Sequence, residues 1–414
     1  MTISSGKSTP IWAAGSVILI LLAVFGARMF SGETSSAAPA VTTRDSAGVE
    51  VVESIRPAWD EGKGWRVGSN PELKLGVVDG DPVYQFSGIT GLARLDDGTV
   101  VVADDGSQEV RFFDAEGTAE AVVGGRGGGP GEFTGLSGLG ANPAGGVWAY
   151  DFSLRRVTWM NAMGEITHLS TLGNEPPVLN SMGALPDGSF VLKQLWGYSA
   201  VAGAQDPGLR RDPVAVVRFD SAGTLLDTLG LYPGREVYLF EEDGRGVMST
   251  PPFAHNAVGT ILGDGIVVGT QEDFSLLEYD TQGELRRIVR IPGRVSRVQA
   301  QDLQAYIQSR LEDAPPERQP SIRQSLQEMP HPETLPAYGG VLGDRSGNLW
   351  VAEWAMAPRL PSHWTVFDQA GQWLGDVTIP QGFLPWDIGE DWILGTERDE
   401  LDVEYVVLYP LRKG

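Results

Sequence analysis

The sequence contains no cysteine and only four histidines, at positions 168, 255, 331 and 363. The first absence excludes disulfide bonds, thiolate metal sites and a cysteine nucleophile. The chain also lacks a His-Glu-x-x-His motif and a Gly-x-Ser-x-Gly motif. Zinc hydrolases need clustered imidazoles and α/β-hydrolases need a nucleophile elbow, so the sequence disfavours both classes of enzyme.

Positive charge is also scarce, because 31 Lys and Arg residues stand against 54 Asp and Glu residues, for a net charge of −23. Binding to a nucleic-acid backbone needs clustered Lys and Arg, so we expect no nucleic-acid partner. Glycine and proline are abundant by contrast, with 54 and 27 residues, which favours many short strands joined by turns. A chain of 414 residues exceeds the size of one compact core and therefore contains several domains or repeats.

One long apolar run lies near the N-terminus. Residues 11–27 carry no charge and are rich in Ile, Leu, Val and Ala, with Lys7 before the run and Arg28 after it. This length is at the short end of the range for a membrane-spanning helix. We predict a cytoplasmic stub (1–10), a single-pass transmembrane signal anchor (11–27) and a flexible Ser/Thr/Ala-rich linker (28–48). A cleaved signal peptide remains the alternative for the same run.

From residue 49 to residue 414, the chain repeats one phrase of four strands and two turns. The first turn carries a glycine in five copies, at positions 98, 146, 188, 265 and 347. The second turn opens with Asp or Asn and closes with Gly, at 114–117, 161–164, 220–223, 280–283 and 368–371. Units of about 40–50 residues with four strands are typical of propeller blades. The repeats therefore predict an all-β fold, a six-bladed β-propeller whose copies begin near residues 89, 136, 181, 259, 339 and 383.

The last copy is incomplete, and two other copies are followed or interrupted by insertions. The last copy, 383–411, holds only three strands, and an open edge invites aggregation, so we predict that residues 73–78 supply the missing strand. The third copy carries an insertion at about 197–212. A helical insertion at about 296–330, between blades 4 and 5, has apolar residues at helical spacing and predicts helices over 298–311 and 317–327. This pair could cover the central channel or pack on the outside, and the sequence leaves both open.

The glycine-rich phrase 127–133, followed by 147–151 and 155–157, resembles an NHL repeat. Residues from about 49 to 410 resemble the six-bladed β-propeller family of bacterial envelope proteins, which is similar to NHL and TolB-like propellers. The resemblance implies a propeller on the extracytoplasmic (periplasmic) side of a bacterial inner membrane. It implies no particular reaction, because propellers host unrelated functions. The loop 124–131 itself is expected to be a connection between blades that needs left-handed backbone.

One polar acceptor recurs where the second strand of each copy ends. The six residues are Asp104, Asp151, Gln194, Gln271, Glu353 and Glu397. In a ring, these side chains would surround the channel mouth and bind a divalent cation such as Ca²⁺, or a cationic or hydroxylated ligand. The alternative is that each one caps its own loop or pairs with an arginine, as Asp151 would with Arg155 or Arg156.

Two tryptophans, Trp196 and Trp354, closely follow these acceptors and are predicted to contact a ligand. We therefore expect a membrane-tethered propeller that binds a ligand or a protein, or acts as a scaffold. Its partner would be an envelope protein, a peptide or a carbohydrate, with no cofactor beyond a divalent cation in the channel. The alternative is a metal-dependent lactonase or lyase, as some six-bladed relatives are. The sequence identifies no catalytic residue.

Overall fold

The computed structural model of the chain describes residues 40–197, 207–242, 245–312, 314–356 and 359–413. The predicted transmembrane run 11–27, the stub before it and most of the linker lie outside these residues. Among the helices of the described segments, none has the length and apolar character needed to cross a membrane.

The described chain is mostly β-structure, arranged as a series of antiparallel sheets that we number I to VI in chain order. Sheets I to III are formed by β5 (Ile89–Arg94), β6 (Val100–Asp104), β7 (Glu109–Phe113) and β8 (Ala119–Gly124); by β9 (Leu136–Ala141), β10 (Val147–Asp151), β11 (Arg156–Met160) and β12 (Ile166–Thr171); and by β13 (Leu179–Ala184), β14 (Phe190–Gln194), β16 (Pro213–Phe219) and β17 (Leu225–Pro233). Sheets IV to VI are formed by β20 (Val258–Leu262), β21 (Gly265–Gly269), β22 (Ser275–Tyr279) and β23 (Leu285–Arg290); by β24 (Val341–Gly343), β25 (Leu349–Ala352), β26 (His363–Phe367) and β27 (Trp373–Thr378); and by β28 (Leu384–Ile388), β29 (Trp392–Arg398) and β30 (Glu404–Arg412).

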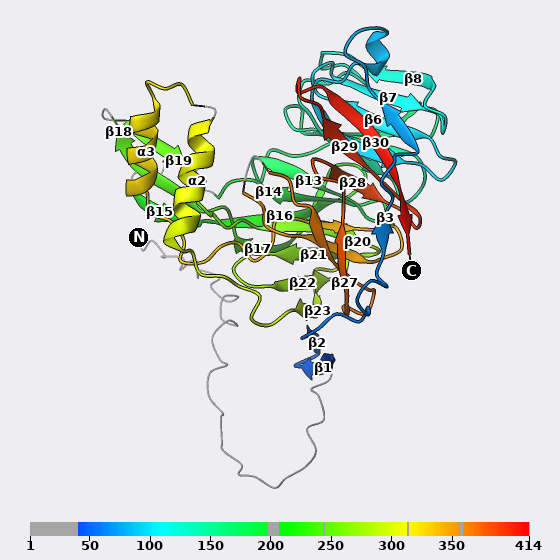
Figure 1. Cartoon of the computed structure of the whole chain (residues 1–414). Coiled ribbons are helices and arrows are strands. Elements are labelled where there is room, and N and C mark those ends of the chain that lie inside the picture. The colour runs from blue at the N-terminus through cyan, green and yellow to red at the C-terminus, as the bar shows by residue number, and fades with distance from the viewer. Residues whose placement is uncertain (1–39, 198–206, 243–244, 313, 357–358, 414) are drawn as a thin grey trace, which may run out of the picture. The chain divides into compact units, whose positions relative to one another are not determined.

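The first strands of these sheets contact one another in chain order, and the cycle closes where β28 contacts β5. In Figure 1, the red strands of sheet VI accordingly lie beside the blue and cyan strands of sheet I. Each seam between neighbouring sheets contains a buried apolar cluster that draws residues from both sheets. The predicted core residues Trp148, Trp350 and Trp392 are buried in these seams, as expected. This arrangement is that of a β-propeller.

Sheet VI receives its fourth strand from the beginning of the described chain. Strand β4 (Leu73–Leu75) pairs antiparallel with Val406–Leu408 of β30, and β3 (Arg66–Val67) pairs with the end of the same strand. Leu75 is 5% exposed and belongs to the apolar cluster between sheets VI and I. The predicted completion of the last sheet by residues 73–78 is therefore confirmed.

The chain upstream of β4 also lies along outer sheet edges. Strand β2 (Val49–Ser54) pairs in parallel with β23 of sheet IV, and β1 (Val41–Ser46) pairs with β2. Farther along, Ala58 and Trp59 donate backbone hydrogen bonds to β27 of sheet V, at 3.0 and 2.8 Å. We call residues 49–75 the strap, because they run from sheet IV across sheet V to sheet VI.

The predicted linker 28–48 is wrong for residues 41–46, which form β1 rather than a flexible tether. This strand is polar and mostly exposed, so it has no alternating apolar pattern that the sequence could have revealed. Its order comes from the six paired positions that it shares with β2.

The second turn of the repeat has one construction in five sheets. In the first copy, the Asp114 carboxylate accepts the backbone N–H groups of Glu116 and Thr118, and Gly117 has a φ of +87°. The same carboxylate or amide cap occurs at Asn161, Asp220, Asp280 and Asp368. A side chain at Gly117 would also meet Leu75 of the neighbouring sheet at 2.7 Å. The turn glycine therefore serves both the left-handed backbone and the close approach of the next sheet.

Two additions lie outside the repeats. Helices α2 (Ala300–Glu312) and α3 (Gln319–Glu328) lie between β23 and β24 in the chain, within two residues of the predicted helices. A small sheet of β15 (Gly208–Arg210), β18 (Val237–Glu242) and β19 (Arg245–Ser249) was not predicted. Its strands are short and lie outside the repeated four-strand phrase.

Candidate functional site

Three of the predicted acceptors hold the backbone that leads into the first strand of their own sheet. Asp104 accepts the N–H of Ser87 at 3.2 Å, and Asp151 accepts the N–H of Thr134 at 2.7 Å. Gln271 accepts from Asn256 at 2.8 Å. Its amide N–H group also donates to the carbonyl oxygen of Tyr338, at 2.9 Å, which extends this hold to the entrance of the next sheet. All three acceptors are buried.

The other three acceptors act around the third strand. Gln194 accepts from the N–H of Ala215 in β16, and Glu353 accepts from Ser362 and His363 at the start of β26. Glu397 accepts the phenol O–H of Tyr409 at 2.6 Å and lies 3.6 Å from the ammonium group of Lys74.

Electrostatics at these positions follows from the hydrogen bonds. Partial burial raises the pKa of Glu353, but hydrogen bonds from His363 and Ser362 outweigh it, so the pKa is lowered overall. Burial and the neighbouring Glu397 carboxylate raise the pKa of the Tyr409 phenol. Both shifts describe groups that are already paired inside their own sheet.

The predicted ion pair of Asp151 with Arg155 or Arg156 is wrong. Arg155 donates instead to the carbonyl oxygens of Gly173 and Pro176, and Arg156 donates to those of Gly128 and Glu132. The two carboxylate oxygens of Asp151 accept backbone N–H groups from the loop that precedes β9 and from the loop that follows β10.

These contacts bear on metal binding. Within the residues that the structure describes, no group of three or more His, Cys, Asp or Glu side chains could hold a metal ion. Five of the recurring acceptors accept backbone N–H groups, and Glu397 binds Tyr409 and Lys74, so this donor set does not fit a resident Ca²⁺. Their role in binding another ligand is not tested by these contacts and stays a prediction.

The two predicted ligand tryptophans have different surroundings. Trp196 is half-buried, and the Arg235 guanidinium lies 5.4 Å from its ring centre. Trp354 packs against Phe253 at 5.9 Å, and Phe253 also contacts Tyr306 of α2 and His331. The aromatic cluster around Phe253 therefore connects α2 and the loop after β25 to the loop before β20. Phe253, at the centre of this cluster, is 2% exposed.

One cavity follows the first strands of all six sheets. It measures about 1010 Å³, and its walls include small residues such as Gly138, Ser181, Gly259 and Gly343. Since ligand pockets commonly span about 300–1,000 Å³, this channel is large enough for a small molecule or a short peptide segment. The small residues at these positions keep the channel open.

One end of the channel is acidic and contains an organised ion pair. Arg345 binds Asp387 through two hydrogen bonds, of 2.7 and 3.1 Å, and lies 3.5 Å from Asp96. The Arg345 guanidinium also lies 5.2 Å from the ring centre of Trp392. Asp97 and Asp344 also line this cavity, so its lining residues include four carboxylates and one guanidinium.

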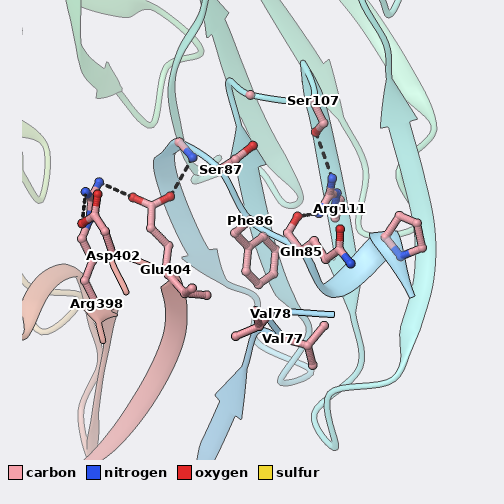
Figure 2. A pocket seen from close by; sticks show the side chains of 14 residues that line it. Val77, Val78, Gln85, Phe86, Ser87, Ser107, Arg111, Arg398, Asp402 and Glu404 are labelled. Carbon is pink, nitrogen blue, oxygen red and sulfur yellow. Dashed lines mark hydrogen bonds and ion pairs between the residues drawn. The ribbon is translucent and has the colours of Figure 1, made fainter. Parts of the chain in front are cut away.

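A second cavity, of about 700 Å³, lies where sheets VI and I meet (Figure 2). Its charged residues are engaged with protein groups: Glu404 accepts the N–H groups of Gly88 and Ile89 at 2.7 and 2.9 Å and also binds Arg398. Arg111 donates to Glu109, Ser107 and two backbone carbonyl oxygens. These groups hold the seam together, and sequence reasoning missed Glu404 because Gly88 and Ile89 are more than 300 positions away from it.

Comparison with known structures supports the fold. A member of the DUF4221 family from Bacteroides vulgatus is similar to this chain, with a TM-score of 0.52 and 12% identity, over 86% of this chain and 100% of that one. A gluconolactonase from Xanthomonas campestris (TM-score 0.42, 14% identity, 84% and 100% covered) and virginiamycin B lyase from Staphylococcus aureus (0.40, 12%, 83% and 99%) are more distant. At these identities the likeness shows the fold alone, a β-propeller type. No protein-family model and no curated protein matches the chain.

Proposed function

We propose that the chain is a six-bladed, NHL- or TolB-like propeller that binds a ligand, or a protein segment, in its central channel. The observation that carries this proposal is the cavity of about 1010 Å³ along the first strands of all six sheets. Small residues line the walls of this cavity, and Arg345 binds Asp387 at its acidic end. The predicted metal donors form hydrogen bonds within the protein, and the described residues contain no group that could hold a metal ion. A binding role needs only this shape and polarity.

The cellular setting of the proposal comes from the sequence. The apolar run 11–27 would hold the protein in a bacterial inner membrane, with the propeller on the periplasmic side. A partner there would be an envelope protein, a peptide or a carbohydrate. Helix α2 would contribute to binding through Tyr306, which joins the aromatic cluster of Phe253 and Trp354.

The test is a thermal-shift screen of the full chain in detergent micelles against amino acids, short peptides, sugars and organic acids. Any true ligand raises the melting temperature by mass action. Ser181→Phe should abolish the shift, because Ser181 lines the channel and a phenyl ring would fill the space beside it. Thr228→Phe, an exposed position on β17, is the matched control and should leave the shift intact.

If each ligand that raises the melting temperature of the wild type raises that of Ser181→Phe by the same amount, binding lies outside the channel and the proposal is overturned. Metal analysis of the same preparation tests the donor argument separately. Stoichiometric Ca²⁺ that survives dialysis would show that the loop-cap carboxylates do hold a metal.

A further inference from the structure

Four of the six first strands contain a β-bulge where they pair with the second strand of their sheet. In sheet I, Ile89 and Gly91 pair with adjacent residues of β6, so Thr90 between them is an extra residue. The same irregularity adds one residue to β9, β13 and β28. The described first strands of sheets IV and V pair without such a shift. The four added residues are Thr90, Ser137, Met182 and Trp386.

All four added residues line the central cavity. A bulge interrupts the alternation of side chains along a strand and re-aims the residue that it adds, and bulges are frequent beside functional sites. The first strands of sheets VI, I, II and III contact one another in that order. The added residues therefore form one continuous arc of the channel wall, which we call the bulge arc.

Neighbouring bulges of sheets I to III lie side by side. In these three sheets a glycine follows the added residue, and the first strand of the next sheet approaches that glycine closely. A Cβ atom at Gly91 would lie 2.5 Å from Leu139 of β9. One at Gly138 would lie 2.3 Å from Ser181, which directly precedes Met182. The bulge arc is therefore at one level of the channel in these sheets.

The sheet VI end of the bulge arc is held against sheet I. Asp387, which follows Trp386, accepts the backbone N–H of Arg94 in β5 at 2.9 Å. Its carboxylate also binds Arg345 at 2.7 Å, so the charge beside Trp386 is already paired. Trp386 itself is half-buried, and its indole N–H donates to Thr396 at 3.2 Å. The indole therefore offers a ligand its apolar π surface.

The bulge arc joins two apolar contact groups with two hydroxyl groups, and none of the four side chains is charged. Trp386 at one end and Met182 at the other offer π and thioether surfaces, which both favour an aromatic partner. Between them, the Thr90 hydroxyl has no hydrogen-bond partner among the described residues. The Ser137 hydroxyl donates to the carbonyl oxygen of Tyr150 at 3.4 Å, which leaves its lone pairs able to accept.

We propose that the bulge arc binds an uncharged aromatic ring that carries a hydroxyl or amide group at its edge. The face of the ring stacks on Trp386, and its polar group bonds the hydroxyls of Thr90 and Ser137. This inference rests on the proposed function and deepens it by naming a ligand class for the channel. The ring can belong to a small molecule or to a side chain of a peptide, and the experiment separates these two sources.

The experiment compares 4-methylphenol with 4-methylcyclohexanol, which keeps the hydroxyl group but has no π face, by titration calorimetry on the full chain in detergent micelles. Heats measured with protein-free micelles are subtracted. A stacked aromatic ring should bind about two- to tenfold more tightly than the saturated ring. Trp386→Leu should remove this preference, and Trp386→Phe should keep most of it. Trp65→Leu, the same change at a half-buried tryptophan of the strap, is the matched control and should keep the preference.

Two further pairs of probes sharpen the result. Blocked Ala-Tyr-Ala and Ala-Leu-Ala peptides test the second source of the ring. A preference shown by the peptides alone indicates a protein segment, and one shown by the phenol alone indicates a small molecule; each result supports the aromatic site. 4-Methylanisole lacks the O–H group of 4-methylphenol, and Ser137→Ala should reduce the preference for the phenol over it.

Equal affinity within both aromatic–aliphatic pairs, no binding of any of these probes, or a preference that survives Trp386→Leu would overturn the inference. The screen with Ser181→Phe decides the proposed function separately. A ligand whose binding Ser181→Phe abolishes, and Trp386→Leu does not affect, would leave the channel as a binding site without its aromatic subsite. An aromatic preference that persists in Ser181→Phe would place the ring outside the channel and also overturn the inference.

Discussion

The outer edges of sheets IV to VI differ from those of sheets I to III. The strap adds β2 to sheet IV, backbone hydrogen bonds to sheet V, and β3 and β4 to sheet VI. Strands β8, β12 and β17 have no such addition within the described chain and are the outermost strands of their sheets. Sheets IV to VI, which we call the covered half, thus have outer edges that pair with a segment distant in sequence. Sheets I to III, which we call the open half, are each complete without such a segment.

Sheets of both halves contain a β-bulge next to the outer strand. The pairing of the third and fourth strands contains an irregularity just before the second turn in sheets I to V, for example between Phe112 and Phe113. Such bulges twist a strand and discourage pairing with another chain. The difference between the halves is therefore one of closure, since sheet VI alone lacks a fourth strand of its own.

The largest expected effect lies at the closing strand. Leu75→Ala should reduce the free energy of unfolding by about 2–5 kcal/mol, because it removes a buried side chain from the cluster between sheets VI and I. Val122→Ala, on the open edge strand β8 and 49% exposed, should cost at most ~0.5 kcal/mol. Denaturant unfolding of the full chain measures both, and equal losses would remove the distinction between the halves.

The next effect concerns pH at the seam where the open and covered halves meet. Lys193 has a pKa of about 8 in the folded protein against an ordinary value of 10.5. The unfolded chain therefore binds more protons between these values, and the free energy of unfolding should rise with pH by up to ~1.4 kcal/mol per unit.

Lys193→Met should flatten that rise between about pH 8 and 10. Tyrosines such as Tyr232, whose pKa burial raises, oppose the slope at higher pH, but they do so equally in both proteins. The difference between wild type and variant isolates the lysine, and identical slopes would contradict its lowered pKa.

A smaller effect is expected at Glu404, which joins sheet VI to the entrance of sheet I (Figure 2). Glu404→Gln should cost about 1–3 kcal/mol, since charge-assisted hydrogen bonds to Gly88 and Ile89 are weakened inside a buried seam. Glu120→Gln, at an exposed position on β8, is the control and should be nearly neutral. If both variants lost the same free energy of unfolding, the loss would come from the change in net charge and not from the hydrogen bonds that close the seam.

The smallest effect should be the same in both halves. Asp220 in sheet III and Asp368 in sheet V cap identical turns, each with two backbone N–H groups. Replacement of either by Ala should cost about 1 kcal/mol. A clearly larger loss at Asp368 would show that the strap stiffens even the local turns of the covered half.

The repeat could be predicted from the sequence because its turns depend on residues that are close together in the chain. Turns that open with Asp or Asn and close with Gly located the strands, and the three-stranded last copy indicated where closure was needed. Strands β1, β18 and β19 were missed. They lie outside the repeated phrase, so its turn signals could not locate them, although β1 pairs with the next strand β2 and β18 with the next strand β19.

For the candidate site, the sequence pointed to one polar side chain per sheet. It could not decide between a ring of ligands and a set of loop caps, because both produce the same spacing. Hydrogen bonds such as Asp151 to Thr134 and Glu353 to His363 now account for these side chains. Lys193 carried no sequence signal, since it belongs to no motif.

The sequence by itself determined the strands and turns of the repeats and the acidic character of the chain. These follow from local backbone preferences and from composition, which need no distant partner. The tertiary structure decided that β4 completes sheet VI, that the strap covers three edges and that Glu404 holds the closing seam. It also buried Lys193, which lowers the pKa of its ammonium group, because only the folded chain fixes which charges are desolvated.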